Sequence, residues 1–98
     1  SLSFDEVVVD ASKAGALVIP AHIDRPSYSV LANLGFLPTL PYTAVEMVNP
    51  TAQAWTVITA SDAHFLEEVG KRSCILEMEE IGWEALKRSL GEQRNVRF

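Results

Sequence analysis

Short apolar runs that end in polar residues are the feature that most limits the folds open to this chain. The runs "ALVI" at 16–19, "AVEMV" at 44–48 and "TVITA" at 56–60 are too short for buried helices. Continuous apolar runs of this length are typical of strands covered on both faces, as in parallel sheets. A fourth run, "SCILEME" at 73–79, alternates apolar and acidic residues, so one of its faces is expected to meet water or a polar neighbour.

Helices are predicted between and around these runs. Ser3 and Glu6 have the spacing of a capping box, which predicts a helix over about residues 4–14. A second, shorter helix is expected to open at Pro26-Ser27, and a third is expected over about residues 83–90. This alternation of helices with short buried strands indicates an α/β fold with about four mostly parallel strands and three helices.

The composition indicates one globular domain over residues 1–98, since 48% of the residues are hydrophobic. The longest apolar run is far shorter than the roughly 18 residues of a membrane span, and no secretory leader opens the chain. Cys74, the single cysteine, excludes an internal disulfide and fits a reducing cytosol, so we expect a cytoplasmic protein with a buried structural thiol. With a net charge of −5 and no cluster of basic residues, the chain is not expected to bind duplex nucleic acid.

Polar residues follow two of the apolar runs. "PAHIDRP" at 20–26 follows the first run, and "SDAH" at 61–64 follows the third; they contain His22 and His64, the only histidines of the chain. Because the carboxyl ends of parallel strands lie at one edge of a sheet, we expect these loops to be neighbours. Asp62 and His64, two residues apart, can face the same side, and imidazole and carboxylate suit zinc, manganese or iron. His22, Asp62 and His64 are therefore candidate metal ligands.

Each candidate also fits a structural role. A histidine at a strand end is commonly a hydrogen-bonded structural residue, and Asp62 fits the N-cap of a helix. Arg25 either contacts a phosphate through its planar guanidinium or pairs with Asp24 or another acid. Glu46, alone in an apolar run, is either a site carboxylate or a hydrogen-bonded core group. Lys71-Arg72 fits a solvated turn, with phosphate contact as the alternative.

Several other kinds of site are not supported by the sequence. Ser61 lacks the Gly-x-Ser-x-Gly elbow of a serine hydrolase. Neither a Walker A pattern nor a Gly-x-Gly-x-x-Gly loop occurs, so a nucleotide phosphate loop is not expected. Trp55 and Trp83 are predicted to lie in the core and not on a ligand platform.

Three segments together resemble a known family. "GALVIPAHIDRPSYSVLANLGFLP", "AVEM" and "VITASDAHFLEEVG" are similar to the C-terminal part of a PHP domain, the polymerase and histidinol phosphatase family, over about residues 4–90. The resemblance implies part of a distorted (β/α)7 barrel with several divalent metal ions, Zn, Mn or Fe, at the carboxyl ends of its strands. It also implies hydrolysis of phosphate esters, either small molecules or oligonucleotides. His22, Asp62 and His64 would then bind metal and Arg25 would lie near the phosphate, whereas Glu46 receives no clear role.

The chain departs from the family pattern in its ligand set. The N-terminal His-x-His pair, a mid-domain Glu and further His ligands are missing, and two histidines cannot complete a three-metal site. Since the chain also begins with Ser and not Met, we expect the C-terminal segment of a PHP domain, inactive alone and with weak or no metal binding. Its partner would be the remaining N-terminal part of that domain. The alternative is a non-catalytic docking module that self-associates through open sheet edges.

Overall fold

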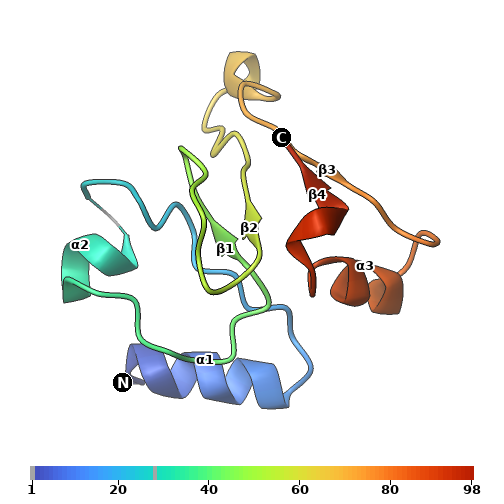
Figure 1. The fold of residues 1–98 in the computed structure, drawn as a ribbon. Coiled ribbons are helices and arrows are strands. Elements are labelled where there is room, and N and C mark those ends of the chain that lie inside the picture. The colour runs from blue at the N-terminus through green and yellow to red at the C-terminus, as the bar shows by residue number, and fades with distance from the viewer. Residues whose placement is uncertain (1, 28) are drawn as a thin grey trace.

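The computed structural model of the chain describes residues 2–27 and 29–98 and has a small mixed α/β fold (Figure 1). The helices are α1 (Phe4–Lys13), α2 (Val30–Leu34) and α3 (Trp83–Ser89), with 3-10 helices η1 (Leu66–Glu68) and η2 (Gln93–Asn95). The strands are β1 (Val45–Glu46), β2 (Val57–Ile58), β3 (Ile75–Leu76) and β4 (Val96–Arg97). β1 and β2 form a parallel pair, and β3 and β4 form an antiparallel pair.

The predicted α/β class is confirmed, but the prediction of mostly parallel pairing is wrong. The described strands form two separate pairs and no closed barrel, and one pair is antiparallel. The antiparallel partner is β4, in the C-terminal segment, where the sequence predicts no strand. After α3 the chain turns through η2 and returns beside β3, with Leu76 opposite Val96. Val96 is buried there, so burial of one apolar side chain accompanies this pairing.

The predicted strand at 16–19 is present only as a segment beside β1. Thr43 N–H donates to Val18 O at 2.8 Å, and Glu46 N–H donates to Pro20 O at 3.0 Å, so the segment follows β1 in the same direction. Its own N–H groups do not complete a ladder, because Val18 N–H donates to the Thr43 hydroxyl and Pro20 has no N–H. Because of the Thr43 hydroxyl and Pro20, segment 16–19 lacks the regular backbone pairing of a strand.

α1 covers one face of this layer. Ser3 caps the helix by accepting the Glu6 N–H at 3.2 Å, as the sequence predicts, and Gly15 follows its last turn with φ +87°. Val8 is the fully buried residue of the helix. The core cluster joins α1 to β1, β2 and their flanking loops: Val8, Ile23, Tyr42, Val45, Met47 and Val57. Figure 1 shows α1 along one side of the β1–β2 layer.

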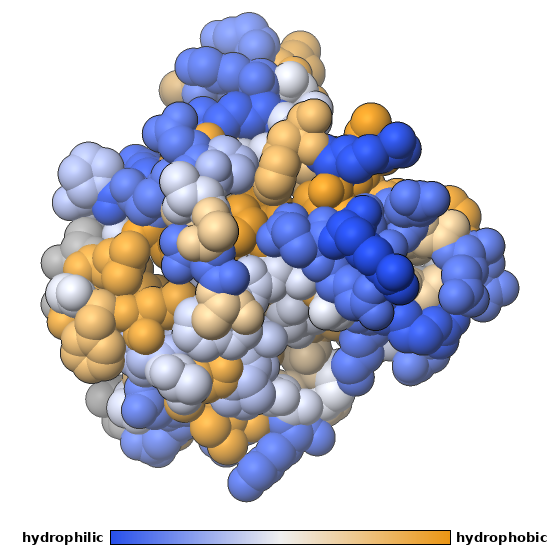
Figure 2. All heavy atoms as spheres, viewed as in Figure 1, coloured by the Kyte–Doolittle hydropathy of each residue, from blue (hydrophilic) through white to orange (hydrophobic). Residues whose placement is uncertain are grey.

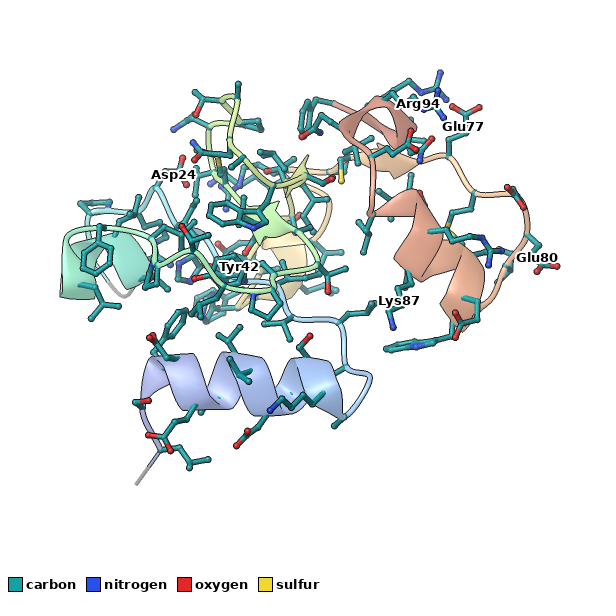
Figure 3. The ribbon with its side chains drawn as sticks, turned by 60° about the horizontal axis from the view of Figure 1, so that its bottom comes forward. Asp24, Tyr42, Glu77, Glu80, Lys87 and Arg94 are labelled. Atoms are coloured by element: carbon teal, nitrogen blue, oxygen red, sulfur yellow. The ribbon has the colours of Figure 1, made fainter. Side chains whose placement is uncertain are left out.

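Aromatic rings close the end of the core near α1 (Figure 3). The Tyr42 ring packs edge-on against Trp55, with centroids 5.0 Å apart, and lies 6.3 Å from Phe4. Its hydroxyl donates to Pro38 O at 2.7 Å. Burial raises the pKa of Tyr42, and the nearby Asp5 carboxylate raises it further. Trp55 thus packs against the core as predicted, whereas Trp83 is 53% exposed and its predicted burial is wrong.

On the face that Figure 2 shows, polar side chains prevail over the C-terminal segment and apolar ones gather over α2. Leu34 and Phe36, at and beyond the end of α2, are 44% and 61% exposed. Cys74 is a free thiol and only partly buried, so the prediction of a buried thiol is correct only in part. None of the helices in the described part of the chain has the length and apolar character that crossing a membrane needs.

The outer edge of β2 is covered by one side chain. The Gln93 amide accepts the Val57 N–H at 2.6 Å and donates to Val57 O at 2.9 Å. This pair of hydrogen bonds takes the place that a neighbouring strand would have. Val57 is only 2% exposed, so the Gln93 amide pairs two backbone groups of a buried residue. Gln93 thereby ties the C-terminal segment to β2.

We predict that Gln93→Ala lowers the free energy of unfolding by about 2 kcal/mol, because it leaves two buried backbone groups unpaired. Gln53→Ala is the matched control, since Gln53 is exposed and its amide only donates to Thr51 Oγ1 at 3.3 Å. The control should change the free energy by less than about 0.5 kcal/mol. Urea unfolding followed by circular dichroism measures both, and equal losses in the two variants would contradict the role assigned to Gln93.

Candidate functional site

The loop after the 16–19 segment is fixed onto the end of β1 by Glu46. Glu46 N–H donates to Pro20 O, and Ile23 N–H donates to Glu46 O at 2.9 Å. The side chain of Glu46 adds a third bond, in which Oε1 accepts the His22 N–H at 2.9 Å. One carboxylate oxygen of Glu46 is therefore hydrogen-bonded to the backbone of a candidate metal ligand, so Glu46 is a hydrogen-bonded group that lies next to the candidate site.

Asp24 joins the same loop to the residues that follow β1. Its two carboxylate oxygens accept the N–H groups of Val48 at 2.7 Å and Asn49 at 2.8 Å, and Figure 3 shows Asp24 among the loops at this end of the molecule. Burial tends to raise the pKa of Asp24, but the N–H groups of Asn49 and Val48, with a contribution from Arg72, outweigh it and hold the pKa below its ordinary value. Asp24 is therefore a structural carboxylate.

The lowered pKa of Asp24 predicts a loss of stability in acid. A carboxyl whose pKa is lower in the folded chain stabilises it above the unfolded pKa of about 3.9 and stops doing so as the pH falls through the folded value. Asp24→Asn should therefore lower the free energy of unfolding by about 2 kcal/mol at pH 7. The difference from wild type should shrink as the pH falls below about 4.

Asp10→Asn is the matched control for this substitution. Asp10 is exposed on α1, and its carboxylate makes no hydrogen bond or ion pair within residues 2–27 and 29–98. Denaturant unfolding of the three proteins between pH 3 and pH 7 measures the effect. A difference for Asp24→Asn that stays constant across this range would show that the ionised carboxylate is not what stabilises the loop.

An ion pair connects the two candidate ligand loops. Arg25 Nη1 lies 2.8 Å from Asp62 Oδ2, and both side chains are about one-third exposed. The expectation that these loops are neighbours is thus confirmed. The alternative that Arg25 pairs with an acid is confirmed as well, with Asp62 and not Asp24 as its partner. Asp62 does not cap a helix either, because η1 begins after Phe65. Loops that are 37 residues apart in the sequence meet through this pair.

Two of the candidate ligands have an unfavourable backbone conformation. His22 has φ +32° and Asp62 has φ +51°, and within the described residues they are the two non-glycine positions with positive φ. This region costs about 1 to 2 kcal/mol per residue for side chains other than glycine. His22 carries a second cost, because its buried Nδ1 has no hydrogen-bond partner among the described residues. Costs of this kind concentrate at functional sites.

His64 is held in a form that leaves one nitrogen for a ligand. Its Nδ1 lies 2.8 Å from the carbonyl oxygen of Asp62, and its own N–H donates to Glu68 Oε1 at 3.3 Å. A carbonyl only accepts hydrogen bonds, so Nδ1 carries the proton and Nε2 is left with a lone pair in the neutral ring. Histidines that bind metal commonly have their second nitrogen fixed in this way.

An open cavity of about 320 Å³ lies beside the Arg25–Asp62 pair. Three cationic side chains line it together with two carboxylates and His64: Arg25, Lys71, Arg72, Asp62 and Glu68. Arg72 is fixed there, because its guanidinium donates to Ala60 O and Ser61 O at 3.1 Å. The excess of cations favours an anionic ligand. His22 is not one of the lining residues.

The described residues do not complete a metal site. Within residues 2–27 and 29–98, no three His, Cys, Asp or Glu side chains gather closely enough to hold an ion. Asp62 and His64 contact each other, and Arg25 joins their loop to the loop of His22, but the three candidates do not form one ligand shell. Their role as metal ligands therefore stays a prediction.

Some residues that shape the site were missed in the sequence. Ser61 Oγ accepts the N–H groups of Gly70 and Arg72 and donates to Arg72 O, so it fixes the turn that carries Lys71 into the cavity. The Glu68 carboxylate accepts the backbone N–H of His64, which lies four residues earlier in the sequence. The position of Asp24 in the sequence is consistent with its structural role, because a carboxylate in a loop that follows a strand commonly accepts neighbouring N–H groups. Nothing in the spacing of Ser61 and Gly70 indicates their contact.

Comparison of the chain with models of known protein families, with curated protein sequences and with solved structures finds no match.

Proposed function

We propose that this chain belongs to a metal-dependent phosphoesterase of the PHP family, which hydrolyses a small-molecule or oligonucleotide phosphate ester. The observation that carries the proposal is the contact between the "PAHIDRP" and "SDAH" loops through Arg25 and Asp62. A phosphoesterase needs metal ligands beside cations that bind phosphate, and these two loops supply both kinds of residue. The partly exposed single cysteine fits a cytoplasmic protein.

The proposed division of roles follows the geometry of the loops. His22, Asp62 and His64 would bind divalent metal ions, Zn, Mn or Fe, with His64 using the Nε2 atom that its Asp62 contact leaves free. Such ions, when bound, would activate a water molecule for attack and would stabilise the charge on the phosphate oxygens. Arg25 and Lys71 would orient the phosphate in the cavity, where Arg72 adds a fixed positive charge.

We further propose that the chain forms the C-terminal part of a (β/α)7 barrel. The parallel β1–β2 pair, with segment 16–19 alongside, fits such a barrel, and α1 covers one face of it. Val45 and Val57 pair on that buried face, whereas Glu46 and Ile58 pair on the opposite face and are only half-buried. This second face would line the barrel interior, and the N-terminal part of the domain would supply the remaining ligands.

Loss of one ligand should lower both metal content and catalysis. In the full-length protein, Asp62→Asn and His64→Ala should reduce the bound metal per chain and lower kcat/KM by at least about 100-fold. The substrates are p-nitrophenyl phosphate and bis-p-nitrophenyl phosphate, assayed with Mn²⁺ or Zn²⁺ after elemental analysis. Asp10→Asn, which removes the same charge from the exposed face of α1, should leave both quantities unchanged.

Two results would oppose the proposal. Unchanged metal content and turnover in His64→Ala would exclude His64 as a ligand. A wild-type protein that is folded but neither binds a divalent ion nor hydrolyses either ester would exclude the phosphoesterase as a whole. Thermal unfolding with and without added Mn²⁺ supplies a separate readout, because an ion bound to the folded state raises the midpoint.

A second candidate function, self-association as a docking module, is favoured by exposed apolar side chains in the C-terminal segment. Ile75, Ile81 and Phe98 are 59%, 99% and 65% exposed. The β1–β2 pair has little free strand edge for self-association, since segment 16–19 and Gln93 cover its outer edges. Light scattering decides this candidate: a stable dimer would support it, and a folded monomer at high concentration would oppose it.

A further inference from the structure

The cavity beside the Arg25–Asp62 pair has a charge opposite to that of the whole chain. The net charge of the chain is −5, yet three of its eight Lys and Arg side chains line this one cavity, together with two carboxylates. The rest of the chain therefore carries a clear excess of negative charge. A small anion is attracted into such a cavity, whereas a long polyanion would be repelled by the acidic surface around it.

Two of the three cations in the cavity have no carboxylate partner. Arg25 lies 2.8 Å from Asp62, so these two charges cancel at the wall of the cavity. Lys71 and Arg72 form no ion pair within the described part of the chain. The other carboxylate of the cavity accepts a backbone N–H and contacts neither cationic side chain. Two unpaired positive charges match the two negative charges of a phosphate monoester.

The two unpaired cations are placed by hydrogen bonds before any ligand binds. The Arg72 guanidinium donates from Nε to Ala60 O and from Nη2 to Ser61 O, both at 3.1 Å. Its Nη1 group makes no hydrogen bond among the described residues, so two N–H donors stay available for a ligand oxygen. Ser61 Oγ accepts the N–H groups of Gly70 at 2.9 Å and Arg72 at 3.2 Å, and Lys71 lies between them. Such preorganisation lowers the cost of ordering on binding.

We propose that Lys71 and Arg72 form a binding site for the doubly charged phosphate of a small-molecule monoester, and that this site binds it without a metal ion. The open cavity of about 320 Å³ has room for the phosphate and a small organic group. Arg25 is not the anchor in this state, because Asp62 is its partner. The inference deepens the proposed function by naming its substrate class, and its link to catalysis rests on that function.

An NMR chemical-shift titration of the protein tests the site, after metal is removed on a chelating resin. Methyl phosphate carries two charges at pH 8, and dimethyl phosphate carries one charge and only one methyl group more. At low ionic strength methyl phosphate should bind at least about tenfold more tightly and shift the amide signals of Gly70 and Arg72. A 5′-phosphorylated oligonucleotide should bind no more tightly than methyl phosphate. Equal affinities for the two methyl esters, binding of neither, or tighter binding of the oligonucleotide would overturn the proposal.

Substitution of Lys71 tests the assignment of the residues. Lys71→Ala should weaken methyl phosphate binding by about 5- to 10-fold, and Lys71→Arg, which keeps the charge, should stay within about twofold of wild type. Lys87→Ala is the matched control, because Lys87 is exposed on α3 and makes no ion pair among the described residues (Figure 3). It removes the same charge elsewhere and should leave the affinity unchanged. Equal weakening in Lys71→Ala and Lys87→Ala would show that the anion binds by net charge alone and would overturn the site.

Asp62→Asn separates this site from the proposed function. The substitution removes a negative charge from the cavity and releases Arg25, so metal-free binding of methyl phosphate should become about 3- to 10-fold tighter. Under the proposed function the same substitution lowers metal content and turnover. Weaker metal-free binding in Asp62→Asn would overturn the inference. A protein that binds methyl phosphate as described, but hydrolyses no phosphate ester with Mn²⁺ or Zn²⁺, would support the site and overturn the phosphoesterase.

Discussion

The hydrogen bonds between Glu46 and residues 20–23 are the constraint on which the candidate site depends. They fix the His22 loop to the end of β1, and this places Asp24 beside Val48 and Arg25 beside Asp62. One loop thereby binds the residues at the ends of two neighbouring parallel strands. Arg25, in the loop that is attached in this way, contacts Asp62 of the "SDAH" loop at 2.8 Å. The site is thus built from the backbone of β1 outward.

The backbone conformations of His22 and Asp62 are unfavourable, and a hydrogen bond to Glu46 and an ion pair with Arg25 hold them in place. Positive φ at both residues, and a buried unpaired nitrogen in His22, are unfavourable in any protein that uses them only as structure. Asp62 has a partner in Arg25, at a distance of 2.8 Å. Under the proposed function, a divalent ion would give the His22 ring a partner as well, and the Arg25 guanidinium would become available to a phosphate.

The sequence was sufficient for features that depend on nearby residues. The Ser3 cap and the parallel pairing of two apolar runs depend on local spacing and on continuous hydrophobicity, and they were predicted. The β3–β4 pair and the Gln93 bonds to Val57 depend on contacts across 20 residues or more, for which the sequence has no local signal. In the site, the neighbouring loops followed from strand direction, but the partner of Arg25 did not, since Asp24 and Asp62 are equally acidic in sequence.

X-ray diffraction from crystals of the protein grown with Mn²⁺, with anomalous data collected at the manganese absorption edge, tests the central claim most directly. We expect anomalous peaks within bonding distance of the His22 imidazole and of Asp62 or His64 Nε2. Peaks confined to other parts of the molecule, with His22, Asp62 and His64 all uncoordinated, would contradict the assignment of these strand ends to a metal-dependent active site.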